Sequence, residues 1–132
     1  MTLPRIDHIG IIVEDLGKSV KLFERRLGLK LTGTKEMPEV GLKIAQIASA
    51  NVKIELIQYI DDTNSFGKKV MGKQNGFNHI SIEVENIHGM LKRLENKGLK
   101  VMAGFPRQGS QGKVAFFEPE TTEGVLLELC EG

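Results

Sequence analysis

Apolar and polar residues alternate in several short stretches of the chain, and this period of two is typical of β-strands with one buried face. The stretch IDHIGIIVED at residues 6–15 has this pattern, and so does FNHISIEVEN at residues 77–86. In each stretch the alternation runs into a residue that favours a helix N-terminus, Asp15 in the first and Asn86 in the second. Each stretch therefore predicts a strand that is followed directly by a helix.

The segments after Asp15 and Asn86 change to the spacing of an amphipathic helix. Their apolar positions are Leu16, Val20, Phe23 and Leu27 in the first segment and Ile87, Met90, Leu91 and Leu94 in the second. Each pattern stops at a glycine, Gly28 or Gly98, and glycine adopts a left-handed C-cap without strain. Two equivalent helices are therefore predicted.

Three further strand-like stretches follow each helix. They cover roughly residues 29–35, 41–49 and 52–60 in the first half and 99–103, 113–118 and 124–131 in the second. The turn signals between them are Pro38 to Gly41, Ala50-Asn51, Pro106 to Gly112 and Pro119 to Gly124. Each half is therefore predicted to have the element order β-α-β-β-β.

The two halves are copies of one module. A shift of 71 residues aligns Ile9 with Ile80 and Glu14 with Glu85, and the agreement continues into the helices. The expected single domain spans residues 1–132, with module 1 at about 4–60, a linker at about 61–75 and module 2 at about 76–132. We expect an α+β fold in which a pseudo-twofold axis relates the modules and their strands form a cupped mixed sheet. The linker stretch SFGKKVMGK is expected to form a short helix.

Composition narrows the functional class without identifying it. The 132 residues are 40% hydrophobic and 27% charged, and 18 basic against 17 acidic residues leave a formal charge of +1. This balance lacks the basic excess of a nucleic-acid-binding protein, and the apolar runs are far shorter than the ~20 residues of a membrane span. The single cysteine, Cys130, and the absence of a signal-peptide pattern lead us to expect a cytoplasmic protein.

Two histidines and two glutamates occupy equivalent positions in the modules. His8 and His79 stand third in the two repeated phrases, while Glu55 in IELI and Glu128 in LLEL lie in the last strands. A carboxylate on an apolar strand is costly to bury unless its charge is compensated. Each residue alone would be interpreted as structural, but the pseudo-twofold repetition predicts that all four gather around a divalent metal ion. His88 has no counterpart in the first module, and we assign it no function.

With these residues the chain is identified as a member of the vicinal oxygen chelate superfamily, which includes glyoxalases, bleomycin resistance proteins and dioxygenases. The resemblance covers essentially the whole chain. In the four-ligand enzymes of this superfamily, paired βαβββ modules supply metal ligands from the first and last strand of each module. The resemblance therefore implies His8, Glu55, His79 and Glu128 as ligands. This set argues against the bleomycin-binding branch, which lacks the ligands, and the extradiol dioxygenases, which use three.

The C-terminal part resembles methylmalonyl-CoA epimerases more than glyoxalase I. The stretch EPETTEGVLLEL has the epimerase length and its GVLxEL ending, and the loop at 109–112 with Lys113 gives the epimerase pattern G-x-x-G-K. Departures are Asn78 and Glu118, where epimerases usually have histidines. The strand position where some epimerases carry a glutamate base is Ile44, so Gln46 on the same face is expected at most to hydrogen-bond substrate.

The resemblance implies an isomerase that interconverts (2R)- and (2S)-methylmalonyl-CoA through an enolate. A metal acting as a Lewis acid would stabilise the developing charge, and Glu55 and Glu128 would be the catalytic bases on opposite faces of the substrate. The metal could be cobalt, nickel, manganese, zinc or iron(II). We expect a coenzyme A thioester as substrate and a homodimer, with no nucleic-acid or membrane partner. Alternatives are a glyoxalase I-like lactoylglutathione lyase acting on a thiol hemithioacetal and a non-catalytic protein that binds a small molecule.

Overall fold

The computed structural model describes residues 3–61 and 64–132, so residues 62–63 of the expected linker lie outside the described residues. The chain forms two compact units. One contains residues 8–78, and the other contains His79–Gly132 together with Met1–Asp7. We call them the 8–78 unit and the 79–132 unit. Each carries one β-α-β-β-β series, so the α+β class predicted from the sequence is confirmed.

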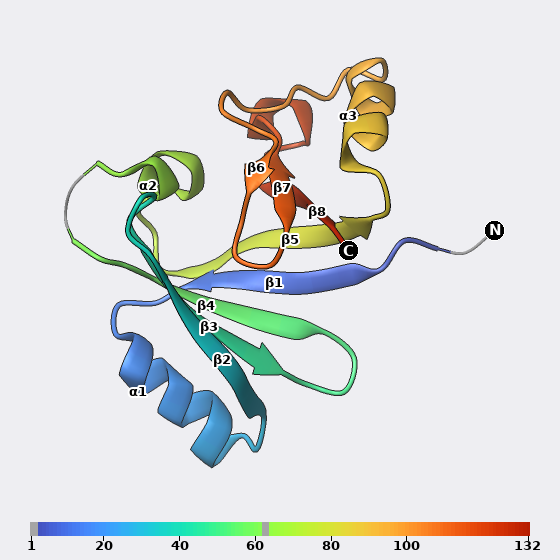
Figure 1. Cartoon of the computed structure of the whole chain (residues 1–132). Coiled ribbons are helices and arrows are strands. Elements are labelled where there is room, and N and C mark those ends of the chain that lie inside the picture. The colour runs from blue at the N-terminus through green and yellow to red at the C-terminus, as the bar shows by residue number, and fades with distance from the viewer. Residues whose placement is uncertain (1–2, 62–63) are drawn as a thin grey trace. The chain divides into compact units, whose positions relative to one another are not determined.

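The 8–78 unit contains a sheet with the strand order β2-β3-β4-β1 (Figure 1). Its elements are β1 (Ile6–Ile12), which begins in the other unit, α1 (Leu16–Lys21), the π-helical turn η1 (Leu22–Arg26), β2 (Lys30–Met37), β3 (Leu42–Ala48), β4 (Lys53–Tyr59) and α2 (Phe66–Met71). Strands β1 and β4 are parallel, whereas β2 and β4 both run antiparallel to β3. The first and last strands of the module are therefore direct neighbours.

The 79–132 unit repeats this arrangement with the strand order β5-β8-β7-β6. Its elements are β5 (Gly76–Val84), which begins in the preceding unit, α3 (Ile87–Glu95), β6 (Arg107–Gln108), β7 (Lys113–Phe116), the 3-10 turn η2 (Pro119–Thr121) and β8 (Leu127–Glu131). Again the first and last strands, β5 and β8, pair in parallel. None of the helices within residues 3–61 and 64–132 has the length and apolar character needed to cross a membrane.

The predicted helix boundaries are confirmed by their caps. The Oδ1 atom of Asp15 accepts a hydrogen bond from the Lys18 amide at 3.0 Å, and Asn86 Oδ1 accepts one from the Gly89 amide at 3.1 Å. Such side chains satisfy backbone N–H groups that a helix N-terminus leaves without partners. Gly28 has φ +76°, as the predicted C-cap requires.

The strand expected at residues 99–103 is wrong. Only an isolated bridge between Val101 and Phe117 forms there, and the short β6 lies at Arg107–Gln108, where a turn was expected. Gly104 turns the chain with φ +89°, and Pro106 has no N–H to donate to a neighbouring strand. Before Pro106 the contact is limited to this bridge and two backbone hydrogen bonds, from the Met102 amide to the Phe116 carbonyl at 2.9 Å and from the Glu118 amide to the Lys100 carbonyl at 2.7 Å. The ladder of β6 with β7 forms beyond Pro106.

In each unit the helix covers one apolar face of the sheet. In the 8–78 unit the buried centre is Ala45, Ile47 and Leu56, against which apolar side chains of α1 and η1 pack. In the 79–132 unit the buried centre is Val84, Ile87, Leu91, Ala115, Phe117 and Leu129. Because side chains alternate along a strand, the residues between these core positions point to the opposite face of each sheet.

The short helix expected in the linker is confirmed as α2, and Tyr59 connects it to the end of β4. The Tyr59 hydroxyl donates a hydrogen bond to the Gly72 carbonyl just after α2, and Lys68 Nζ lies 5.2 Å from the centre of the Tyr59 ring. Burial raises the pKa of Tyr59 from 10.0 to about 12. This contact fixes α2 against the sheet of its own unit.

The sole tyrosine of the chain is expected to ionise late in the folded protein, and its raised pKa makes the fold less stable at high pH. Between pH 10 and 12 the unfolded chain has lost the Tyr59 proton and the folded chain has kept it, so the free energy of unfolding falls as pH rises. Ultraviolet absorbance should give a tyrosinate midpoint near 12, and Tyr59→Phe should remove the signal. A midpoint near 10 would contradict the burial of this hydroxyl.

Candidate functional site

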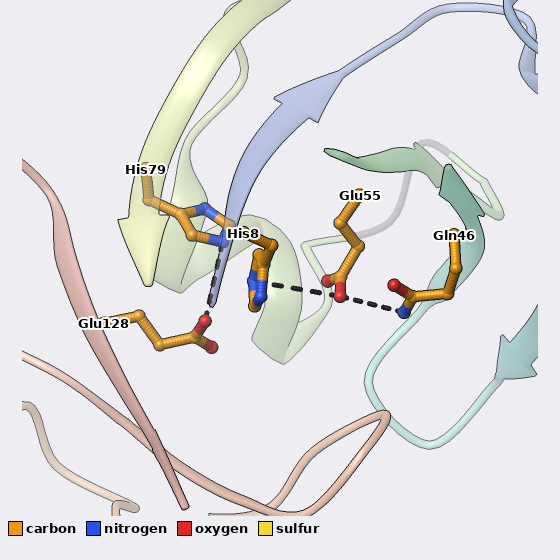
Figure 2. Close-up of polar contacts among 5 residues, drawn as sticks. All are labelled: His8, Gln46, Glu55, His79 and Glu128. Carbon is orange, nitrogen blue, oxygen red and sulfur yellow. Dashed lines mark hydrogen bonds and ion pairs between the residues drawn. The ribbon is translucent and has the colours of Figure 1, made fainter. Parts of the chain in front are cut away.

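The 8–78 unit brings His8 and Glu55 together on the sheet face opposite α1. Ile54 and Leu56 pack on the helix side, so Glu55 between them points to the other face. His8 Nε2 lies 3.8 Å from Glu55 Oε2 (Figure 2), and both side chains are less than a tenth exposed. The parallel pairing of β1 with β4 sets this approach, since Gly10 lies opposite Glu55 in the ladder.

The 79–132 unit builds the equivalent pair from His79 and Glu128. Leu127 and Leu129 pack on the helix side of β8, so Glu128 points to the opposite face. His79 Nε2 lies 3.7 Å from Glu128 Oε1 (Figure 2), and His79 is almost fully buried. Ser81 lies opposite Glu128 in the ladder, which is the register of Gly10 and Glu55 in the other unit.

The two glutamates have different neighbours on the antiparallel strand beside them. Gln46 lies directly opposite Glu55, and its Nε2 donates a hydrogen bond to Glu55 Oε2 at 3.0 Å (Figure 2). Phe116 occupies the corresponding place opposite Glu128. Its ring lies edge-on to the His79 ring, with 5.0 Å between the ring centres. The repeat therefore keeps the His–Glu pair and changes the residue that supports it.

A second repeated contact fixes each last strand to the helix of its own unit. Gln58 Oε1 accepts a hydrogen bond from the Leu16 amide at 2.8 Å, and Glu131 Oε2 accepts one from the Ile87 amide at 2.9 Å. Both side chains follow the glutamate of their strand by three residues, in the repeated pattern E-L-x-[Q/E]. This repeated pattern is the signal in the sequence that points to Gln58 and Glu131 as equivalent residues.

Each His–Glu pair fits the requirements of a metal ion. Imidazole nitrogen and carboxylate oxygen are ligands that suit divalent transition metals. The separations of 3.8 and 3.7 Å exceed a hydrogen bond. In octahedral coordination, two ligand atoms that each lie about 2.1 Å from the ion are about 3.0 Å apart at adjacent positions and about 4.2 Å apart at opposite positions. The observed distances lie between these limits, and the burial of both carboxylates calls for a compensating positive charge.

The other residues singled out in the sequence are not placed to transfer a proton. Ile44 is buried on β3 opposite Ile57, so no proton-transfer group stands at that position. Asn78 Nδ2 donates a hydrogen bond to the Met71 carbonyl at 2.8 Å. Burial raises the pKa of the Cys130 thiol to about 11, which keeps it protonated near neutral pH. His88 is exposed on α3.

Gln46 makes a contact that the sequence did not lead us to expect. Its place on the same strand face as Ile44 was predicted from the alternation, and a hydrogen bond to substrate stays a prediction, while the structure adds a hydrogen bond to Glu55. The only signal was the antiparallel pairing of the two strands, whose register a single sequence leaves open.

Comparisons with known proteins agree with the repeated architecture. Residues 7–117 match the family described as the Glyoxalase/Bleomycin resistance protein/Dioxygenase superfamily. The chain is 33% identical to the uncharacterised protein YqjC of Bacillus subtilis, over 96% of this chain and 91% of that protein. It is 32% identical to the mitochondrial methylmalonyl-CoA epimerase of Homo sapiens, over 96% of this chain and 73% of that one.

Solved structures and a second class of relatives extend these matches. A methylmalonyl-CoA epimerase in complex with methylmalonyl-CoA and NH4+ superposes with a TM-score of 0.85 at 27% identity, over 99% of this chain and 96% of that one. A lactoylglutathione lyase of Salmonella typhimurium is 30% identical over 96% of this chain and 92% of that enzyme. With its duplicated βαβββ units and these matches, the chain belongs to the glyoxalase/bleomycin resistance/dioxygenase superfamily, the vicinal oxygen chelate family expected from its sequence.

Proposed function

We propose that this protein is a metal-dependent epimerase that interconverts (2R)- and (2S)-methylmalonyl-CoA. The observation that carries the proposal is the buried His–Glu pair repeated in each unit, at 3.8 Å and 3.7 Å. Relatives and structural neighbours that are methylmalonyl-CoA epimerases support the substrate class. The proposal includes the homodimeric state and cytoplasmic location expected from the sequence.

The proposed metal ligands are His8, Glu55, His79 and Glu128, two from each unit. When bound, a divalent ion would supply Lewis acidity that stabilises negative charge developing on the substrate oxygens. Such an ion prefers neutral imidazole and ionised carboxylate ligands. Because side chains alternate along a strand, the side chains of these four residues point to the sheet face opposite the apolar core of their unit.

Proton transfer is assigned to the two glutamates. Epimerisation removes the α-hydrogen from one face of the substrate carbon and returns a hydrogen to the other face of the planar intermediate. A carboxylate on each face can act as base in one direction and as acid in the other. Glu55 and Glu128 occupy equivalent positions in two related units, so they supply one such group each. Ile44 supplies none.

The proposal is tested by proton exchange. Metal-loaded protein incubated with (2S)-methylmalonyl-CoA in deuterated water should give both epimers, each with deuterium at the α-carbon. Nuclear magnetic resonance follows the loss of the α-proton, and chiral analysis follows the change of configuration. Retention of hydrogen and configuration at high enzyme concentration would refute the assignment.

A glyoxalase I-like activity is the second candidate, and the lactoylglutathione lyase among the relatives favours it. That reaction would use the same four residues on a thiol hemithioacetal. Coenzyme A and glutathione, added separately to metal-loaded protein in a melting assay, distinguish the two substrates. Stabilisation by coenzyme A alone supports the epimerase, and stabilisation by glutathione alone supports the lyase. Stabilisation by coenzyme A without proton exchange would instead indicate a binding protein.

A further inference from the structure

We propose that Gln46 is a positioning residue that holds the carboxylate of Glu55 in the orientation needed to bind the metal ion. The inference rests on the proposed metal centre and adds a residue outside the expected ligand set. It concerns the 8–78 unit alone, because the corresponding position of the other unit carries Phe116.

The contact between Gln46 and Glu55 is determined by the backbone. The two residues face each other in the antiparallel ladder of β3 and β4, on the sheet face opposite α1. Residues directly opposite in such a pair have Cβ atoms about 4.5–5.5 Å apart. The Gln46 amide therefore reaches Glu55 Oε2 at 3.0 Å, and both side chains are buried, with exposed fractions of 8% and 7%.

The chemistry of this contact suits a carboxylate that binds a metal ion. A glutamate side chain rotates about several bonds, and fixing it in one conformation costs entropy. The Gln46 N–H donates to Oε2, the oxygen that also lies 3.8 Å from His8 Nε2. Partners that hydrogen-bond to metal ligands fix their orientation, and their loss commonly weakens metal binding about 10–100-fold.

The second unit shows that the residue opposite the glutamate can be one that packs without donating a hydrogen bond. Phe116 is buried beside His79 and contacts it through its ring edge, and a phenyl ring has no N–H to donate. The sheet geometry alone therefore accepts an apolar residue at this place. We infer that the amide at position 46 serves Glu55, because the fold does not require an amide at that position.

The test uses Gln46→Met, which keeps the length of the side chain and removes the donor. Cobalt(II) binding is measured by titration calorimetry and by the visible absorption of the bound ion, at a temperature where circular dichroism shows every variant folded. We expect cobalt affinity about 10–100-fold weaker than in the wild type, with an altered spectrum. Gln74→Met is the matched control, because Gln74 is exposed and outside the helices and strands, and its affinity should equal that of the wild type.

A second readout requires no metal. The side-chain amide resonance of Gln46 in metal-free protein should shift when Glu55 is replaced by alanine, since the hydrogen bond is lost. An unchanged resonance, or wild-type cobalt affinity in Gln46→Met, would overturn this inference and leave the proposed function standing. A wild-type protein that does not bind cobalt, nickel, manganese, zinc or iron(II) would overturn the metal centre itself, and the inference with it.

Discussion

The Glu128→Gln variant is expected to lose the interconversion of (2R)- and (2S)-methylmalonyl-CoA, and so is Glu55→Gln. Glutamine has the size of glutamate but cannot take up the α-proton, and loss of a positioned acid or base typically costs about 10²–10⁴-fold in rate. Epimerisation needs a proton-transfer group on both faces of the carbon, so either replacement should stop it. Chiral analysis of the product under single-turnover conditions, with bound metal quantified in each variant, measures the loss.

The pattern of exchange in deuterated water tests the assignment of one glutamate to each face. Each variant should still exchange the α-hydrogen of the one epimer whose hydrogen faces the remaining carboxylate, and the two variants should retain opposite epimers. Glu95→Gln, a change of the same kind on the exposed surface of α3, should leave both reactions at the wild-type rate. Full interconversion in both glutamine variants would exclude the two-carboxylate mechanism.

Phe117→Ala is expected to be the most destabilising single truncation in the 79–132 unit. Phe117 is 1% exposed and packs among the apolar residues of α3, β5 and β8. Replacing a buried phenylalanine by alanine removes its transfer free energy and leaves a cavity, at a cost of about 3–5 kcal/mol. Urea unfolding of the metal-free protein, followed by circular dichroism, should show the lower midpoint.

Phe77 provides the matched control for this truncation. Its side chain is 85% exposed, so Phe77→Ala makes the same chemical change with almost no buried area lost. Surface replacements of this kind usually alter the free energy of unfolding by about 0.5 kcal/mol or less. Equal losses in the two variants would contradict the packing of Phe117 in the core.

The repeated parts of the fold could be predicted from the sequence because their signals are local. Asp15 and Asn86 mark helix starts by their own hydrogen bonds, and the alternation around Glu55 and Glu128 shows which strand positions face the same side. The error at residues 99–103 has a different origin. The apolar stretch does lie beside the end of β7, but its pairing is limited to the bridge between Val101 and Phe117, and Gly104 turns the chain soon after.

The residues proposed for the candidate site could be chosen from the sequence, but the residues that contact them could be predicted only in part. Strand alternation leaves open which residue of a neighbouring strand lies opposite Glu55 or Glu128, because that register depends on the whole sheet. Gln46 and Phe116 are found opposite these glutamates only once the pairing of β3 with β4 and of β7 with β8 is known. The hydrogen bond to Glu55 therefore had to come from the structure.

The parallel pairing of the first and last strands of each module has a consequence for the time course of folding. His8 can meet Glu55 only after the intervening helix and two strands have closed a long loop, and His79 can meet Glu128 only after the same closure in the other module. Closure of such loops carries an entropic cost before the strand contacts reward it, which makes these pairings late and slow. Each His–Glu pair therefore forms at the end of the folding of its module, and a nascent chain lacks the second pair until β8 has been synthesised.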